Sequence, residues 1–270
     1  MNNKNCKLIR LSALVPLVFS LQSLAEDEGV ASEEVEAPAF KASVEFGFLY
    51  KTGNTKSTDL KTGASLSYET EKWLSALDFN LLIKKSEVTD DTTGETNFVT
   101  QDDKWDITGQ TNYNLDEGGK HYLYGNVSYA TDEFSNFSKQ SSASAGWGRH
   151  YWNEEKTWSL FMDVGPGVKH DVIRETDTTP EETTTDFIVQ AQALYLLAFN
   201  EHVDFKQHFV FKQAVESGNN SIYKSETSLT AALVDSLQVK ISFRADYDTE
   251  VEPEFEHLNT ETSVTLVYNF

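Results

Sequence analysis

Side chains that could do acid–base chemistry are spread along the whole 270-residue chain. The histidines stand apart from one another, at His121, His150, His170, His202, His208 and His257. None lies in a local sequence typical of a nucleophile or general base, and Ser/His/Asp hydrolysis needs three such groups to converge. We therefore expect no enzyme, no catalytic residue and no cofactor.

Charged residues recur instead at alternate positions, opposite apolar side chains. His208 shares its side of segment 202–213 with Asp204, Lys206 and Lys212, so it fits a charge network better than a catalytic base. Residues two apart lie on one face of a strand, so these charges are expected to face a common interior. The full predicted set is Glu45, Lys61, Asp78, Lys84, Asp106, Asp163, Lys169, Asp204, Lys206, His208, Lys212, Lys224, Glu226, Lys240, Arg244 and Asp246.

The elements that must position these charges are β-strands, because the period of two continues almost without interruption from Phe40 onward. The alternating segments are 42–50, 59–69, 73–84, 105–113, 121–129, 143–152, 158–169, 187–199, 202–213, 223–233, 237–247 and 261–270. Only 121–129 and 143–152 leave the apolar face undecided. Alternating short and long connections around an even set of strands are typical of outer-membrane proteins. The sequence therefore predicts an all-β fold, a transmembrane antiparallel up-and-down β-barrel of about 12 strands.

A soluble β-sandwich also alternates, but its polar face would carry surface Lys and Glu throughout. Here the polar faces are rich in Ser, Thr, Gln and Asn. Aromatic residues stand near the ends of the apolar faces, where amphipathic rings would meet the membrane–water boundary. The predicted aromatic girdle is Tyr50, Tyr68, Trp73, Trp105, Tyr113, Trp158, Tyr223 and Tyr247.

The N-terminal region differs from the rest. A basic start and an apolar run ending in Ser-Leu-Ala make residues 1–25 a predicted cleaved signal peptide. Residues 26–39 are predicted to be an acidic disordered leader, and residues 40–270 to be the barrel. We expect the protein in the outer membrane of a Gram-negative bacterium, in contact with lipid and lipopolysaccharide. The formal charge of −21 argues against a nucleic-acid partner.

The last residues alternate cleanly, with Val264, Leu266, Tyr268 and Phe270 on one face. A barrel must close, so the final strand has to pair with the first. An aromatic last residue is similar to the C-terminal signature of outer-membrane proteins. We therefore predict that these four residues are an assembly signal read by the outer-membrane assembly machinery.

Two further features allow a functional and a structural interpretation. The acids in 89–96 and 246–256 are hard oxygen ligands, but their spacing matches no dedicated calcium loop. We expect solvated acidic connections and no built metal site, with weak divalent cation binding as the alternative. The glycines in 146–152 and 165–167 could leave room for a ligand, but bends and bulges that curve the barrel are the favoured interpretation.

The stretch 48–73, FLYKTGNTKSTDLKTGASLSYETEKW, resembles the opening of the salt-induced outer-membrane protein family, domain of unknown function 481 (YdiY-like). In that opening a strand leads to a Gly-Asn-Thr turn, here Gly53, Asn54 and Thr55, and a second strand ends in Tyr before a Trp. The resemblance extends over roughly residues 42–270 and implies an outer-membrane barrel. It implies no assigned activity, so no functional residue is carried over.

Two functions fit a barrel of this size. The first is a small pore or solute channel, preferring cations because the long connections at 85–103, 173–186 and 248–257 are acidic. The second is a non-conducting structural or envelope-stress barrel whose paired charges plug the lumen. An outer-membrane enzyme is a distant third.

Overall fold

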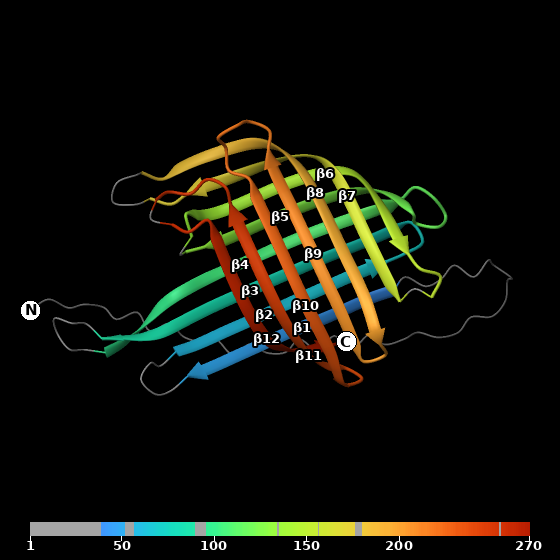
Figure 1. Cartoon of the computed structure of the whole chain (residues 1–270), viewed down its shortest axis with the longest axis horizontal. Helices are drawn as coiled ribbons and strands as arrows, with labels where there is room; N and C mark the ends of the chain where they lie inside the picture. The colour runs from blue at the N-terminus through green and yellow to red at the C-terminus, as the bar shows by residue number, and fades with distance from the viewer. Residues whose placement is uncertain are drawn as a thin grey trace, which may run out of the picture. The chain divides into compact units, whose positions relative to one another are not determined.

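The computed structural model describes residues 39–51, 57–89, 96–133, 135–155, 157–175, 180–253 and 255–270. These residues form twelve strands: β1 (Ala39–Lys51), β2 (Ser57–Glu69), β3 (Trp73–Thr89), β4 (Thr96–Asn114), β5 (His121–Asp132), β6 (Phe137–Trp152), β7 (Trp158–Ile173), β8 (Glu182–Asn200), β9 (Val203–Ala214), β10 (Ile222–Val234), β11 (Leu237–Asp248) and β12 (Leu258–Asn269). Each strand pairs antiparallel with its neighbours in sequence, and β1 pairs with β12 to close the barrel (Figure 1). The predicted antiparallel up-and-down barrel is confirmed.

The predicted signal peptide lies outside the described residues, as does the leader except for Ala39, with which β1 begins. The same holds for the family turn Gly53, Asn54 and Thr55. Within the described part of the chain, no helix is long and apolar enough to cross a membrane.

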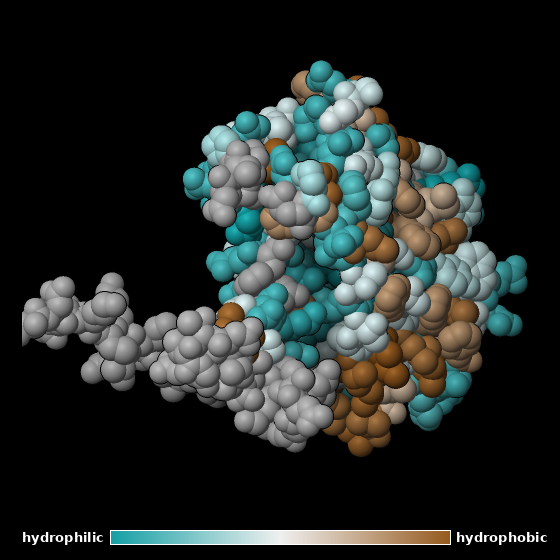
Figure 2. Space-filling view, turned by 60° about the vertical axis from the view of Figure 1, so that its left-hand side comes forward, coloured by the Kyte–Doolittle hydropathy of each residue, from teal (hydrophilic) through white to brown (hydrophobic). Residues whose placement is uncertain are grey.

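Apolar side chains face outward and polar ones inward, as the period of two predicts. On β1, Val44, Phe46 and Phe48 are exposed on the outer surface while Glu45 is buried inside. Figure 2 shows hydrophobic residues gathered on the outer wall beside a hollow rimmed by hydrophilic ones. A soluble protein buries its apolar residues, so this inverted distribution is the arrangement of a barrel surrounded by hydrocarbon.

The two ends of the barrel differ in their connections. Short turns join β2 to β3, β4 to β5, β6 to β7, β8 to β9 and β10 to β11, and we call this the short-turn end. The opposite end is the loop end. The turn after β4 shows how the short connections form: Asp116 accepts hydrogen bonds from the backbone N–H groups of Lys120 and His121, at 2.8 and 2.9 Å. The bond from Lys120 is the main reason that the pKa of Asp116 is lowered. Gly119, at φ 63°, supplies the left-handed residue that the turn requires.

Two of the predicted long connections are shorter than expected. Much of 85–103 continues β3 and β4 as a paired hairpin, with Lys85 opposite Thr100 and Thr89 opposite Thr96. β8 begins at Glu182, so Asp186 lies in a strand instead of a loop, and Asp248 is the last residue of β11. Both carboxylates are buried. The assignment of these two acids to the mouth of the barrel was therefore wrong.

Opposite walls of the barrel lie close enough for side chains to meet across the lumen. In Figure 1, β9–β12 cross in front of β2–β5 at a steep angle. Arg244 on β11 reaches Asp106 on β4 at 2.8 Å, although β12, β1, β2 and β3 separate these strands along the wall. The lumen is therefore largely filled by side chains at the level of such contacts.

A pair of glycines lets β6 and β7 approach closely. A Cβ atom on Gly146 would lie 2.2 Å from the carbonyl oxygen of Val164, and one on Gly165 would lie 2.1 Å from that of Ala145. No side chain fits at such distances, so only glycine permits this backbone approach. The register of β6 with β7 is the same on both sides of this pair, from Ser144 opposite Gly167 to Trp147 opposite Val164, so the structure shows a close approach of the strands at these glycines and no bulge.

Candidate functional site

Among the described residues, three cavities with many polar lining side chains lie one after another in the interior of the barrel. The central cavity has a volume of about 280 Å³, and a cavity of about 470 Å³ lies below it at the short-turn end. These two share Glu45, Lys206 and Lys240 in their linings. Toward the loop end the space narrows to about 50 Å³, and this cavity shares Asp106 and Arg244 with the central one. The cavities therefore follow one another along the lumen, and the smallest of the three lies beside Arg244.

A chain of alternating charges follows the wall of the lower lumen. Lys240 lies 3.0 Å from Glu45 and 3.6 Å from Glu226, and Glu226 lies 3.9 Å from Lys206. The side chains of Lys206 and Glu226 remain 38% and 28% exposed. These pairs neutralise one another along one wall without crossing the lumen, so water keeps access to them.

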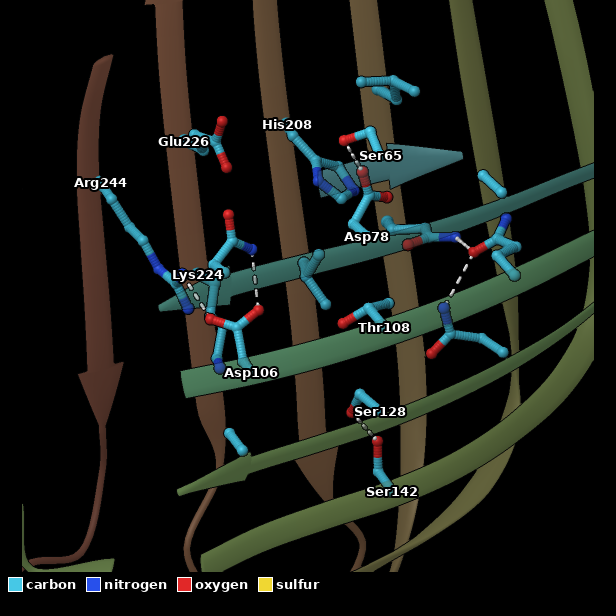
Figure 3. A pocket seen from close by; sticks show the side chains of 18 of the residues that line it. Ser65, Asp78, Asp106, Thr108, Ser128, Ser142, His208, Lys224, Glu226 and Arg244 are labelled. Carbon is cyan, nitrogen blue, oxygen red and sulfur yellow. Dashed lines mark hydrogen bonds and ion pairs between the residues drawn. The ribbon is translucent and has the colours of Figure 1, made fainter. Parts of the chain in front are cut away.

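The upper lumen is bridged from wall to wall. Arg244 donates to Asp106 at 2.8 Å and to Asp246 at 2.9 Å, and in Figure 3 its guanidinium points at Asp106 on the opposing strand. Glu261 on β12 accepts a second bridge, from Lys61 at 2.7 Å and Lys104 at 3.3 Å. Charge-assisted bonds of this kind are the stronger class of hydrogen bond. The side chains that make these bonds occupy the lumen at this level and leave a small cavity beside Arg244.

A third group of charges is fully buried near the loop end between β7 and β8. Lys169 lies 2.5 Å from Asp171 and 2.7 Å from Asp186, and both Lys169 and Asp171 are 0% exposed. Asn219, in the connection after β9, donates to Asp186 at 2.5 Å. Apolar side chains complete the packing around this end, including Phe137, Ile188, Ala214 and Ile222, which are buried. This half of the loop end is therefore a small closed core inside the barrel.

Asp163 on β7 is a buried carboxylate that has no cationic partner among the described residues. Asp163 accepts hydrogen bonds from Gln192 at 2.9 Å, Tyr122 at 3.1 Å and Gln110 at 3.3 Å. Gln192 also donates to Gln110. Four strands contribute to this cluster, and every donor to the carboxylate is uncharged.

The histidines do not converge on a catalytic arrangement. The ring of His150 stacks on Phe161 at 3.7 Å, the Nδ1 atom of His170 lies 2.8 Å from the hydroxyl of Thr185, and that of His257 lies 2.8 Å from the carbonyl oxygen of Asp248. His208 points into the central cavity near Glu226 and Asp78 (Figure 3). In the described residues, no three His, Cys, Asp or Glu side chains form a group that could hold a metal ion.

Most of the predicted inward charges lie in the lumen. Those that line the cavities are Glu45, Asp78, Asp106, Asp163, Asp204, Lys206, His208, Lys212, Lys224, Glu226, Lys240, Arg244 and Asp246. Lys61 and Lys169 make the inner ion pairs described above, and Lys84 shares the inward parity of Asp78 and Asn80 on β3. Their positions agree with the prediction, while their roles remain predictions.

Sequence reasoning missed other inward residues. Glu261, Lys104, Asp171, Asp186 and Asp248 all take part in the interior network, and Tyr122 donates to Asp163. The parity of β12 could have identified Glu261, because it shares its face with Ser263 and Thr265. Tyr122 gave no clear signal, because the apolar face of this strand was undecided.

The positions of the predicted girdle residues can be described, while their role at a membrane boundary remains a prediction. Near the short-turn end, Trp73 and Tyr113 pack edge to face at 4.9 Å, and Trp158 lies 6.3 Å from Tyr195. Nearer the loop end, Tyr223 and Tyr247 stack at 6.1 Å. The remaining predicted positions are Tyr68, which is exposed at the short-turn end, Trp105, which lies 5.3 Å from Tyr129, and Tyr50, whose side chain lies outside the described residues.

The C-terminal residues lie on the outer surface beside the closing seam. Val264, Leu266, Tyr268 and Phe270 are exposed. The backbone N–H of Phe270 donates to the carbonyl oxygen of Ala42 at 3.0 Å, and the ring lies 4.9 Å from that of Tyr268. The pairing of β1 with β12 joins four residue pairs, from Ser43 opposite Asn269 to Phe46 opposite Leu266. The end of the chain therefore completes a short ladder.

A closed antiparallel barrel with an apolar exterior and a charged interior defines the class of outer-membrane-type β-barrels. The chain belongs to the family described as Protein of unknown function, DUF481, which it matches over residues 44–270. It is 25% identical over 256 residues to the uncharacterized protein YdiY of Escherichia coli (strain K12), covering 93% of this chain and 92% of that one.

Solved barrels are similar to this chain at low sequence identity. The translocator domain of the autotransporter NalP from Neisseria meningitidis has a TM-score of 0.44 and 9% identity, over 86% of this chain and 88% of that chain. The NanC porin has a TM-score of 0.44 and 10% identity, over 85% and 98%. The outer-membrane channel DcaP of Acinetobacter baumannii has a TM-score of 0.35 and 8% identity, over 86% and 95%. These TM-scores are too low to transfer any property of those proteins to this chain.

Proposed function

We propose that the protein is a narrow outer-membrane channel for small ions or polar solutes, closed at the level of Arg244 in the conformation described. The observation that carries the proposal is the series of polar cavities that share lining residues and are interrupted beside the Arg244–Asp106 bridge. A barrel that served only as a scaffold would have no need of the 470 Å³ cavity below that bridge.

The bridge can open without loss of the barrel. Arg244 also contacts Asp246, two residues along its own strand, so it can leave Asp106 and keep one carboxylate partner. Side-chain rearrangements of this kind are fast compared with unfolding. A closed ground state with occasional openings then predicts small, intermittent currents.

The test is single-channel conductance in planar lipid bilayers. Arg244→Ser, and the doubly neutral pair Arg244→Ser with Asp106→Asn, should increase the conductance or the open time over the unmodified protein. Arg149→Ser is the matched control, because the guanidinium of Arg149 lies over the ring of Tyr151, 4.8 Å from its centroid, instead of lining a lumen cavity. Insertion is checked by the different gel migration of boiled and unboiled barrel.

The proposal includes cation preference. The formal charge is −21, and the acidic residues include Glu181 and Glu182, which are exposed beside the loop end. An acidic mouth concentrates cations, and the effect should weaken as salt rises because the Debye length shortens. Preference for anions at low salt would contradict this part of the proposal.

A second candidate is a non-conducting structural barrel, favoured by the buried Lys169 group and by the wall-to-wall ion pairs. If the Arg244 variants fold and insert but carry no current, this second function replaces the first. Both functions place the protein in the outer membrane of a Gram-negative bacterium, in contact with lipid and lipopolysaccharide, after insertion by the outer-membrane assembly machinery.

A further inference from the structure

We propose that the central cavity binds a small zwitterionic solute between Asp163 and Lys212. The inference rests on the proposed channel function and names the class of solute. It starts from two buried charges of opposite sign that the protein leaves without a counter-charge.

Asp163 is the negative member. Its side chain is buried, and its Oδ2 atom accepts bonds from the uncharged groups of Gln192, Tyr122 and Gln110. The Oδ1 atom is buried with no hydrogen-bond partner, and no cationic group of the described residues lies within 4.0 Å of the carboxylate. A buried carboxylate with one unbonded oxygen and no cation beside it is costly, so a positively charged donor on a solute would be bound there.

Lys212 is the positive member. Its ammonium group donates to the hydroxyl oxygens of Ser128 and Ser142, at 2.7 and 2.8 Å. In Figure 3 these two serines, which are paired on the neighbouring strands β5 and β6, point toward one another. In the part of the chain that the structure describes, no carboxylate lies within 4.0 Å, whereas Lys169 has two. An ammonium group has three donors, so one remains available to a solute carboxylate.

Gln190 stands between the two charges in the strand register. It lies opposite Lys212 on β9 and opposite Gly165 on β7, and the next inward residue of β8, Gln192, lies opposite Asp163. Gln190 is only 1% exposed, yet neither its amide nitrogen nor its amide oxygen has a hydrogen-bond partner. The amide of Gln190 therefore offers an unbonded donor and an unbonded acceptor next to two charges that have no counter-charge. This arrangement suits a dipolar solute.

Glycines on β6 and β7 allow the close packing behind this site. Gly165 lies between Asp163 and Gly167 on β7, and Gly148 lies opposite Asp163 on β6. A Cβ atom on Gly148 would lie 2.2 Å from the ring of Tyr122, so the absent side chain lets that ring reach Asp163. Asp163, Gln190 and Lys212 all line the 280 Å³ cavity, which has room for a solute of several heavy atoms.

Only a zwitterion satisfies the whole site. A cation would neutralise Asp163 and leave Lys212 without a counter-ion, and an anion would do the reverse. A solute that carries an ammonium and a carboxylate group would bond both, and would add no net charge to the lumen. Its two groups would also match the free acceptor and donor of Gln190.

The experiment is isothermal titration calorimetry on the full barrel refolded in detergent. The probes are glycine, β-alanine and γ-aminobutyrate, which differ in the separation of their charges, with methylammonium and acetate as single-charge probes. We expect at least one zwitterion to bind about tenfold or more tightly than either single-charge probe. Asp163→Asn and Lys212→Met should each weaken that binding by about tenfold or more.

Two further variants keep the test decisive. Gln190→Met keeps the volume and leaves both charges in place, so it should weaken binding even if the charge variants fail to fold. Arg149→Ser removes a cation that lies over the ring of Tyr151 instead of lining the cavity, and it should leave the affinity unchanged. The site is refuted if no zwitterion binds, if methylammonium or acetate binds equally well, or if the Asp163, Lys212 and Gln190 variants all bind like the unmodified barrel.

This measurement needs no current across a membrane, so its failure is separable from that of the channel proposal. A barrel that binds the zwitterion but never conducts would contradict the channel and keep the site. A barrel that conducts but binds none of the probes would contradict the site and keep the channel.

Discussion

The two ends of the lumen contain the same ion-pair chemistry in opposite surroundings. At the loop end, Lys169 and Asp171 are 0% exposed, and their contact is 2.5 Å. Near the short-turn end, Lys206 and Glu226 lie 3.9 Å apart and stay 38% and 28% exposed. Hydration weakens a pair in water, while burial makes the loss of one partner costly. The charges at the loop end therefore stabilise a buried core, whereas those near the short-turn end stay accessible to water.

On the proposed channel function, the same difference assigns separate roles to the two ends. A solute entering from the short-turn end would meet a cavity whose paired charges remain accessible to water. To leave at the loop end it would have to pass Arg244, because the buried Lys169 group and its apolar neighbours occupy the other half of that end. The proposal therefore places the closed point in the upper lumen and the entry of solute in the lower lumen.

The largest expected effect comes from Lys169→Met. This variant leaves Asp171 and Asp186 buried without their cation, and removing one partner of such a group costs about 3–5 kcal/mol. Urea unfolding of the refolded barrel, followed by tryptophan fluorescence, measures the loss in the free energy of unfolding.

Lys206→Met is the matched control at the other end. Its exposed pair with Glu226 should contribute less than about 1 kcal/mol. Equal losses in the free energy of unfolding for the two variants would mean that the loop end and the short-turn end are equally hydrated. That result would contradict the difference described above.

The next effect tests whether the outer wall meets lipid while the lower lumen meets water. Phe209→Lys places a charge on the exposed outer face of β9 and should cost about 2–4 kcal/mol in a bilayer. Thr230→Lys, on the neighbouring strand, points into the lower cavity and should cost far less. The same urea titration in lipid vesicles compares them, and a reversed order would show that the register of β9 and β10 is misassigned.

A smaller effect is expected at the boundary between the two regions. Gly148→Ala drives a methyl group against the ring of Tyr122, which must leave Asp163, at a cost of about 1–3 kcal/mol. Gly125→Ala is the control, since its nearest neighbour would be 3.9 Å away. We expect the control to fall within about 1 kcal/mol of the unmodified barrel and to be slightly stabilising. Indistinguishable free energies of unfolding would mean that Tyr122 is not fixed over Gly148.

The fold was predictable because a strand repeats every two residues whatever its partner. The alternation of Val44, Phe46 and Phe48 with Glu45 already assigns the two faces of β1. Extension of β3 and β4 was not predictable, since Val88, Phe98 and Val99 are exposed and follow no clean alternation. The extended part of that hairpin is held by backbone pairing between β3 and β4, and backbone pairing does not require alternating apolar residues.

The lumen was predictable as a list of inward charges, but its contacts were not. Arg244 and Asp106 meet across the barrel, and their separation of 138 residues gives no local signal. Asp186 lies in an acidic, threonine-rich stretch that looks like a loop, yet it forms the buried group with Lys169. Which of these charges contact one another depends on strand pairing and barrel closure. Neither can be inferred from the local sequence around each residue.

The smallest expected effect on stability is at the extreme of the short-turn end, where the chain stops at Phe270. This ring is 77% exposed and lies 4.9 Å from the ring of Tyr268, while its backbone N–H extends the ladder to Ala42. Deleting Phe270 should therefore cost only about 1 kcal/mol in detergent refolding. In cells the same deletion should reduce outer-membrane yield strongly, because we predict that the residue is part of the assembly signal. Comparing the two yields separates recognition from burial: insertion that is unchanged, or damaged only in proportion to refolding, would show that Phe270 is an ordinary interfacial ring.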